Sequence, residues 1–343
     1  MEAFDPNGPG MKNGNFIGLP FSLSDAELVL LPVPWDTTVS YNAGTAAGPE
    51  NILQASTQLD LMDADSPDAW KAGIFFEAPN PYWQKRNAEL RPKAAEYIEY
   101  LEHNGILEGN RKMQQILEEI NQSSINLNSW VENQSEGLLR QGKLLGLIGG
   151  EHSVPLGYLK ALAKHHASFG ILQIDAHMDL RKSYEGFNYS HASIAYNILQ
   201  EVPQVSKLVQ VGIRDYCQAE VDIVSNNPDR IKVFYDHSLK ENRFKGINWY
   251  DQVQQIIEHL PQMVYISFDI DGLQAPYCPN TGTPVPGGLS FEEAIFLCVE
   301  VVKSGRQLIG FDLVEVAGPP HEWDANVGAR IVYKLAGLLL SRK

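Results

Sequence analysis

The chain contains little cysteine and no long hydrophobic run. Its three cysteines, Cys217, Cys278 and Cys298, include no CxxC pair, and an odd number leaves one thiol unpaired in any disulfide scheme. No segment approaches the roughly 20 apolar residues that cross a bilayer. Residues 1–16 also lack the basic and then apolar composition of a secretory leader. We therefore expect a soluble protein of the reducing cytoplasm, with no membrane partner.

Positive charge is also scarce. Lysine and arginine total 27 against 42 aspartates and glutamates, for a formal charge of −15. This balance argues against nucleic acid or an anionic membrane as partner. The hydrophobic share of 44% is ample for a large core, and no Gly/Ser-rich or Pro-rich linker divides the chain. We expect a single domain over residues 1–343.

Short apolar runs alternate with amphipathic stretches, which is typical of the α/β class. We predict a three-layer α/β/α domain with a mostly parallel sheet. The expected strands are Glu27–Val33, Leu144–Ile148, Gly170–Ile174, Leu208–Ile213, Ile231–Tyr235, Met263–Phe268 and Gln307–Val314. The expected helices include Pro49–Ser56, Asp251–His259, Phe291–Val302 and Ala325–Leu340.

Residues 64–142 have a different composition. Ala88–His103 and Arg111–Leu139 are charged, rich in Gln and Asn and helical in period, and the segment shows no strand signal. We interpret it as a helical insertion that covers the mouth of the site, forms a subunit contact or only enlarges the fold.

Three short motifs carry side chains that commonly bind metals, each at the carboxyl end of an expected strand. They are Gly149-Gly150-Glu151-His152-Ser153, Asp175-Ala176-His177-Met178-Asp179 and Ser267-Phe268-Asp269-Ile270-Asp271. An extended chain points alternate side chains to the same face, and ligand crevices of open α/β sheets form at this edge. We therefore expect six side chains to converge: His152, Asp175, His177, Asp179, Asp269 and Asp271.

This set of two imidazoles and four carboxylates suits two divalent cations held side by side. The ionised carboxylates carry about four negative charges, which two such cations balance. An oxygen-rich set with few histidines favours Mn²⁺ over structural zinc, which prefers thiolates, although nickel or cobalt would accept the same ligands. The pattern points to a two-metal hydrolytic centre.

Together with Asn280–Gly288, the three motifs resemble the signatures of the ureohydrolases, the family of arginase, agmatinase, formimidoylglutamase and guanidino-acid hydrolases. The resemblance runs from about Val29 to the C-terminus and is interrupted at 64–142. It implies an arginase-like fold and two Mn²⁺ ions on the six residues above. It also implies a small guanidino substrate and a homo-oligomer, either a trimer or a hexamer.

The resemblance also assigns roles beyond the metals. Glu315 resembles the glutamate that pairs with the substrate guanidinium, a planar fork that one carboxylate can hold through two bonds. His191 resembles a pocket histidine that passes protons to the leaving amine, a task for which an imidazole titrating near neutral pH is suited. Thr283 would lie near the bridging hydroxide, and Asp179 is expected to serve both as ligand and in catalysis. His321 is expected near the pocket rim.

Two positions depart from the family pattern. After Asp271 the family usually carries a further Asp-Pro, where this chain has Gln274-Ala275. We expect neutral hydrogen bonds to replace an ion pair there. After Val316 the family usually carries Asn-Pro, where this chain has Ala317-Gly318.

The substrate tail is less clearly indicated. Arginase is disfavoured, because Cys217 stands where its tail-binding aspartate would fall. Arg181 would repel the ammonium of agmatine if it faced the pocket, and it would hold the carboxylate of a formimidoylglutamase or guanidino-acid substrate. Arg181 would not disfavour agmatine if it pointed away from the pocket and paired with Glu185 or another carboxylate. The Ser190-His191-Ala192 segment favours agmatinase, which forms putrescine and urea. The pattern also leaves open a catalytically silent subunit or a different two-metal hydrolase, such as a deacetylase.

Overall fold

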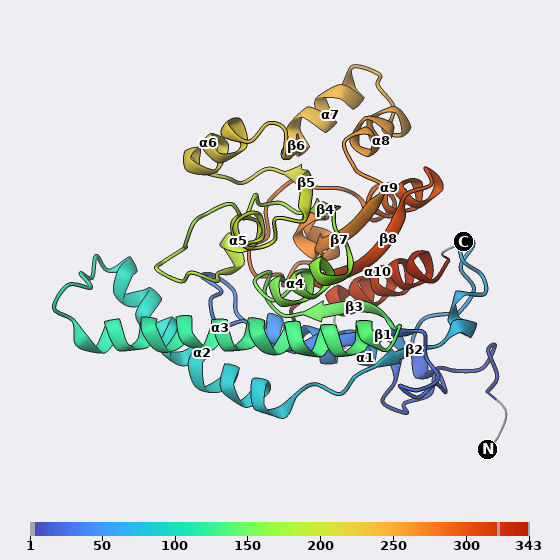
Figure 1. The fold of residues 1–343 in the computed structure, drawn as a ribbon, viewed down its shortest axis with the longest axis horizontal. Helices are drawn as coiled ribbons and strands as arrows, with labels where there is room; N and C mark the ends of the chain where they lie inside the picture. The colour runs from blue at the N-terminus through green and yellow to red at the C-terminus, as the bar shows by residue number, and fades with distance from the viewer. Residues whose placement is uncertain (1–3, 321–322, 342–343) are drawn as a thin grey trace.

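A sheet of eight strands forms the centre of the structure, a computed structural model that describes residues 4–320 and 323–341 (Figure 1). The strands are β1 (Leu28–Val33), β2 (Ile74–Phe76), β3 (Leu144–Gly149), β4 (Phe169–Ile174), β5 (Val205–Ile213), β6 (Ile231–Tyr235), β7 (Met263–Asp269) and β8 (Gln307–Val314). They lie in the order β2-β1-β3-β8-β7-β4-β5-β6, and each neighbouring pair is parallel.

The strands are apolar on both faces, as a parallel sheet covered by helices requires. All six residues of β1 are buried. Leu28 and Leu30 pack into one hydrophobic core, whereas Val29, Leu31 and Val33 pack into the other. This alternation follows from the two-residue period of a strand.

The helices form one layer on each face of the sheet (Figure 1). One layer contains α1 (Gly48–Ser56), α7 (Asp236–Phe244), α8 (Trp249–Glu258), α9 (Phe291–Lys303) and α10 (Trp323–Leu340). The other contains α2 (Pro81–Glu102), α3 (Arg111–Arg140), α4 (Leu156–His165), α5 (Ile194–Glu201) and α6 (Gln218–Asn226). The predicted three-layer α/β/α class is confirmed.

The predicted elements agree with the structure to within a few residues, but the list of predicted helices was incomplete. All seven predicted strands and four helices are present, and α4 to α7 were not anticipated. These four helices have ten residues or fewer, so each offers under three turns of periodicity. None of the helices in the described part of the chain is long and apolar enough to span a membrane.

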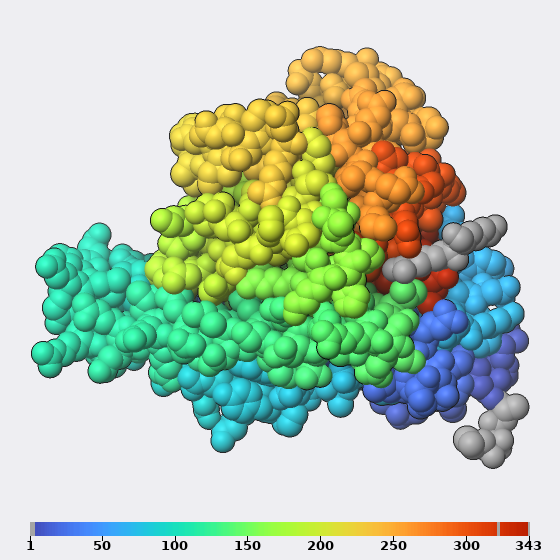
Figure 2. Space-filling model, viewed as in Figure 1, coloured from blue at the N-terminus to red at the C-terminus, as the bar shows by residue number. Residues whose placement is uncertain are grey.

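The segment 64–142 contains α2 and α3, as expected, and also the strand β2. The expectation of no strand there was wrong. Three residues of β2 pair with β1 at the sheet edge, too few to give a recognisable alternation. The turn between α2 and α3 extends beyond the rest of the molecule (Figure 2). That this segment is an insertion into a single domain stays a prediction.

Helix α3 packs mainly against α4, and it also contacts α2, β3 and β1. Ile116, Ile120, Leu127 and Val131 are buried in the second core and recur at helical spacing. Gly157 of α4 allows the close approach, since a Cβ atom there would lie 2.3 Å from the carbonyl oxygen of Asn128.

This packing predicts unequal effects of two similar truncations on α3. Ile120 is fully buried, whereas Ile125 is 42% exposed. We expect Ile120→Ala to lower the free energy of unfolding by about 2–5 kcal/mol, and Ile125→Ala to change it by less than about 0.5 kcal/mol. Urea titration of both variants measures the difference. Equal effects would show that α3 is not part of the main core.

Candidate metal centre and substrate pocket

The six predicted ligands converge because of the strand order. His152 follows β3, Asp175, His177 and Asp179 follow β4, and Asp269 and Asp271 end or follow β7. These strands and β8 are the four adjacent central strands, β3-β8-β7-β4. Segments distant in the chain therefore deliver their side chains to one edge of the sheet.

One group of ligands surrounds Nδ1 of His152. This nitrogen lies 3.0 Å from Oδ2 of Asp175, 3.0 Å from Oδ2 of Asp179 and 3.2 Å from Oδ2 of Asp269. It is buried and makes no hydrogen bond to any described residue. Three carboxylate oxygens and one imidazole nitrogen thus face a common point.

A second group surrounds Nδ1 of His177. This nitrogen lies 3.1 Å from Oδ2 of Asp271 and 3.6 Å from Oδ1 of Asp175. Asp175 therefore presents one oxygen to each imidazole, and the two groups share it. Backbone amides fix the carboxylates, because Ala176 N donates to Asp271 Oδ1 at 3.0 Å and Asp271 N donates to Asp269 Oδ1 at 2.9 Å.

The donor set and its spacing fit two divalent cations. Neighbouring ligands of an octahedral ion with bonds of about 2.1 Å lie roughly 3 Å apart, close to the 3.0–3.2 Å around His152 Nδ1. The other nitrogen of that ring lies 3.0 Å from Ser267 Oγ, which donates to Asp312 Oδ1 at 3.1 Å. Such outer contacts fix the orientation of a metal-binding imidazole.

The carboxylates of this centre repel one another strongly when no cation separates them. Burial and the neighbouring Asp175 raise the pKa of Asp179 to about 7. Burial and Asp271 raise the pKa of Asp269 well above its ordinary value. Bound positive charge would favour the ionised forms of Asp179 and Asp269.

Glu315 reaches the same edge from β8. Its backbone has φ of +62°, a conformation that a residue other than glycine adopts at a cost and mostly at functional sites. Oε1 accepts a hydrogen bond from His152 N at 2.9 Å, whereas Oε2 is buried without a hydrogen-bond partner among the described residues. Burial and the nearby Glu151 raise its pKa well above the ordinary value, so a cationic partner would favour the ionised form.

The predicted pocket residues His191 and Thr283 also lie at this edge. Thr283 Oγ1 donates to Asp271 Oδ2 at 3.5 Å. His191 N donates to Thr38 Oγ1 at 3.2 Å, and its Nε2 lies 3.4 Å from Ser40 Oγ. Burial and the His177 imidazole lower the pKa of His191 to about 3. This environment favours the neutral form of the ring, and the expected role of His191 in proton transfer stays a prediction.

A cavity of about 280 Å³ opens onto His177 and Asp179. Its walls include Ser40, Tyr41, Arg181, Tyr184, His191, Asp215, Tyr216, Glu220 and Thr283. The cavity therefore joins the second ligand group to side chains that can contact a substrate tail.

Arg181 lines this cavity but has partners of its own. Its Nε lies 4.0 Å from Oε2 of the buried Glu220, and its guanidinium carbon lies 4.8 Å from the centre of the Tyr184 ring. Arg181 thus faces the pocket, but its charge is opposed by a carboxylate. That carboxylate belongs to Glu220 and not to Glu185, the pairing partner suggested by its nearness in sequence.

Sequence reasoning missed Asp215 and Tyr216, which follow β5 directly. Both are exposed and line the cavity, and the Asp215 carboxylate has no ion-pair partner in the described chain. The neighbouring Cys217, expected at the tail-binding position, instead caps the start of α6. Its N–H donates to Glu220 Oε2 at 2.9 Å. The sequence does offer one signal for Asp215, an acidic residue that follows the expected strand Leu208–Ile213 at the edge of the sheet where the metal-binding motifs also lie.

Arg214 holds the loop on which Asp271 lies. Its guanidinium donates to the carbonyl oxygens of Asp271 (2.6 Å), Leu273 (3.1 Å) and Val285 (3.0 Å). No carboxylate lies within ion-pair distance of it among the described residues. Charge-assisted hydrogen bonds from Arg214 to backbone carbonyl oxygens thus hold this loop, and the expected neutral replacement at Gln274 stays a prediction.

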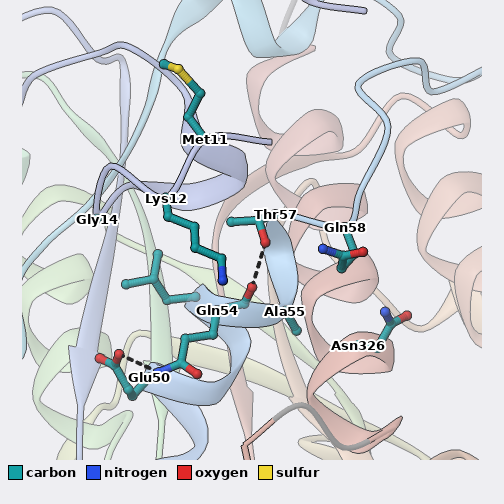
Figure 3. Close-up of a pocket in the computed structure, with 10 residues that line it drawn as sticks. Met11, Lys12, Gly14, Glu50, Gln54, Ala55, Thr57, Gln58 and Asn326 are labelled. Carbon is teal, nitrogen blue, oxygen red and sulfur yellow. Dashed lines mark hydrogen bonds between the residues drawn. The ribbon is translucent and has the colours of Figure 1, made fainter. Parts of the chain in front are cut away.

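A second cavity, of about 550 Å³, lies between residues 11–14, α1 and α10 (Figure 3). Lys12 and Glu50 line it, and Glu50 accepts a hydrogen bond from Gln54. Neither metal-ligand group found in residues 4–320 and 323–341 borders it, so we place no chemistry there. His321, expected at the pocket rim, lies outside the described residues.

Comparisons with known proteins agree with this geometry. A family model described as "Arginase family" matches residues 26–337. The chain is 31% identical over 315 residues to an N(1)-aminopropylagmatine ureohydrolase of Thermus thermophilus, covering 92% of this chain and 90% of the relative. It is 29% identical over 307 residues to an agmatinase of Bacillus anthracis, covering 86% and 85% respectively.

The fold also matches a solved structure. Proclavaminate amidino hydrolase from Streptomyces clavuligerus superposes with a TM-score of 0.73, over 97% of this chain and 99% of that one, at 20% sequence identity. At this identity the likeness concerns the fold.

The shared position of Asp175 predicts that it is needed for both ions. We expect Asp175→Asn to bind less than half the metal of the unmodified protein and to lose activity by at least about 100-fold, since even outer contacts of metal ligands are worth 10- to 100-fold. Asp215→Asn makes the same charge change at the cavity wall and should retain its metal. Elemental analysis of both purified variants tests this, and full metal retention by Asp175→Asn would refute the shared-ligand arrangement.

Proposed function

Because this chain belongs to the arginase family, and is therefore a hydrolase of guanidino compounds, we propose that it cleaves agmatine to urea and putrescine. Agmatine has a guanidinium at one end and an ammonium at the other. The proposal thus requires carboxylates at both ends of the pocket. His177, Asp179 and Asp215 line the cavity, and we infer that Glu315 supplies the carboxylate for the guanidinium and Asp215 the one for the ammonium.

The charge of the cavity wall is the observation that carries the proposal. Besides the metal ligands His177 and Asp179, the wall contains the carboxylate of Asp215, whose backbone pairs with that of His177, the carboxylate of Glu220 and the guanidinium of Arg181. Glu220 opposes Arg181, whereas Asp215 has no such partner among the described residues. An ammonium tail therefore gains an ion pair there, and a carboxylate tail is repelled. This supports agmatine over the carboxylate-tailed substrates of formimidoylglutamases and guanidino-acid hydrolases.

N(1)-aminopropylagmatine is a second candidate, since it carries the same guanidinium on a longer cationic tail. A relative of 31% identity is named for this substrate. Tyr41 and Tyr216 on the cavity wall are 74% and 42% exposed, so the wall continues to the protein surface. A protonated secondary amine can pack against such ring faces.

In this proposal His152, Asp175, His177, Asp179, Asp269 and Asp271 hold two divalent cations, with Mn²⁺ the best match to the ligands. When bound, the pair lowers the pKa of a water molecule and so supplies a nucleophile at neutral pH. Glu315 receives the guanidinium through its unpartnered Oε2 and orients the planar group for attack on its carbon. Gly282 keeps that oxygen accessible, because a Cβ atom there would lie 3.0 Å from it.

His191 takes part in proton transfer. Its neutral ring can accept a proton and deliver it to the departing amine, and Thr38 and Ser40 fix its position. Thr283 is placed to contact the reacting groups beside Asp271. These roles for His191, Glu315, Asp179 and Thr283 are part of the proposal.

Location and assembly also belong to the proposal. The three cysteines are free thiols, which supports a reducing, cytoplasmic compartment. A homo-oligomer, trimer or hexamer, remains our expectation.

A substrate panel tests the proposed function. We expect the Mn²⁺-loaded protein to release urea from agmatine and N(1)-aminopropylagmatine in preference to arginine and 4-guanidinobutyrate, with no formamide from formimidoylglutamate. Asp215→Asn should raise KM for the cationic substrates by about twofold to fivefold, the range of an exposed ion pair. Turnover of acidic substrates alone would instead make Arg181 a carboxylate clamp. Absence of urea and formamide with every substrate would favour a non-catalytic subunit.

Removal of the His191 imidazole should separate proton transfer from metal binding. We expect His191→Ala to keep both ions and to lower kcat by about 100-fold or more, the usual contribution of a general acid or base. Metal analysis beside steady-state kinetics measures both quantities. Loss of metal from the variant would show that His191 was assigned the wrong role.

A further inference from the structure

Residues 34–44, here called the β1 loop, lie beside most of the groups that the proposed reaction uses. Thr38 contacts both oxygens of Glu151, the residue before His152, through its N–H and its hydroxyl, each at 2.8 Å. Thr38 Oγ1 also accepts the bond from His191 N, and Ser40 contacts the His191 ring. Ser40 and Tyr41 line the substrate cavity. The position of this loop therefore affects both the pocket wall and His191.

Two side chains of α2 hold the β1 loop. Asn87 Oδ1 accepts from Asp36 N at 2.8 Å and from Thr37 Oγ1 at 2.9 Å, and its Nδ2 donates to Asp36 Oδ1 at 2.8 Å. Arg91 Nη1 donates to Thr37 O at 3.0 Å and to Val39 O at 2.6 Å. The two acceptors of Arg91 flank Thr38, so this contact fixes the residue that contacts Glu151 and His191.

Helix α2 is a firm support for these contacts. Leu90 and Ala94 are fully buried in the second core, and Asn87 lies on the same helix face at a spacing of three and seven residues. A polar side chain on this apolar face satisfies its hydrogen bonds through the loop, as a buried amide must.

The same helical segment also holds a second part of the pocket wall, residues 181–191. Tyr97 Oη donates to Glu185 O at 2.9 Å. Asn121 of α3 donates to Gly186 O at 3.1 Å and accepts from Asn188 N at 2.9 Å. Residues 181–191 include Arg181, Tyr184 and His191. Both walls thus rest on α2 and α3.

We propose that Arg91 and Asn87 of α2 are positioning residues, which hold the β1 loop so that Thr38 and Ser40 set the orientation of His191 and of the pocket wall. This inference rests on the proposed hydrolase function for its kinetic consequence. It also gives α2 and α3 a role in catalysis, beyond covering the sheet.

Arg91 holds the β1 loop through hydrogen bonds to backbone carbonyl oxygens and not through an ion pair. Within the described residues no carboxylate lies at ion-pair distance from its guanidinium, and one nitrogen makes both bonds. A lysine ammonium has three donors and can make the same two bonds, whereas methionine has the length but no donor. The pair Arg91→Lys and Arg91→Met therefore separates hydrogen bonding from packing.

Arg86 provides a matched control on the same helix. Its guanidinium contacts Glu89, Glu119 and Ser123, all within α2 and α3 and away from the β1 loop. We expect Arg91→Met to lower kcat about 10- to 100-fold, as misplacement of a reacting group by about 1 Å can do. Metal content should be unchanged. Arg91→Lys should recover most of this loss, and Arg86→Met should match the unmodified enzyme. Equal kcat in all four proteins would overturn the proposal.

Hydrogen exchange of the β1 loop tests the positioning role without any substrate. In Arg91→Met the amides of residues 36–44 should exchange faster than in Arg86→Met, while those of β3 remain protected. Unchanged exchange would refute the inference even if the enzyme is active. An unmodified protein inactive on the whole panel would refute the proposed function, and exchange in Arg91→Met would still decide the role of Arg91, as the same measurement on Asn87→Ala would for Asn87.

Discussion

The structure depends on one electrostatic constraint, the gathering of four buried carboxylates at one edge of the sheet. Asp175, Asp179, Asp269 and Asp271 are each 5% exposed or less, and bound positive charge favours the ionised form of such closely spaced acids. Two imidazoles complete two ligand groups that share Asp175. The surrounding polar contacts, from Ser267 behind His152 to the backbone amides at Asp271, keep these charges in place.

The sheet creates this arrangement through its strand order. β3, β4, β7 and β8 are separated by long stretches of chain, yet they are neighbours in the order β3-β8-β7-β4. Glu315 reaches the same edge beside His152, because β8 lies between β3 and β7. Both Asp179 and Glu315 have positive φ angles, 53° and 62°. Such backbone strain persists only where the surrounding packing maintains it.

The sequence predicted the parts of the molecule that have a regular hydrophobic pattern or closely spaced Asp and His residues. Every strand of five or more residues was found, and the six predicted ligand side chains gather at one sheet edge, because apolar runs and alternating Asp and His residues are local signals. That these six residues bind metal stays a prediction. β2, with three residues, gives no such signal. Glu220 and Asp215 were missed because their role depends on where α6 and β5 place them. Asn87 offered a usable hint, a polar residue on an apolar helix face.

Arg214 fixes part of the shape of the site through hydrogen bonds to carbonyl oxygens, which do not titrate. A guanidinium stays protonated at all ordinary pH values, and peptide carbonyls have no proton to exchange. The loop carrying Asp271 is thus fastened by groups that do not titrate. The fastening of this loop therefore does not depend on the protonation of the carboxylates around it.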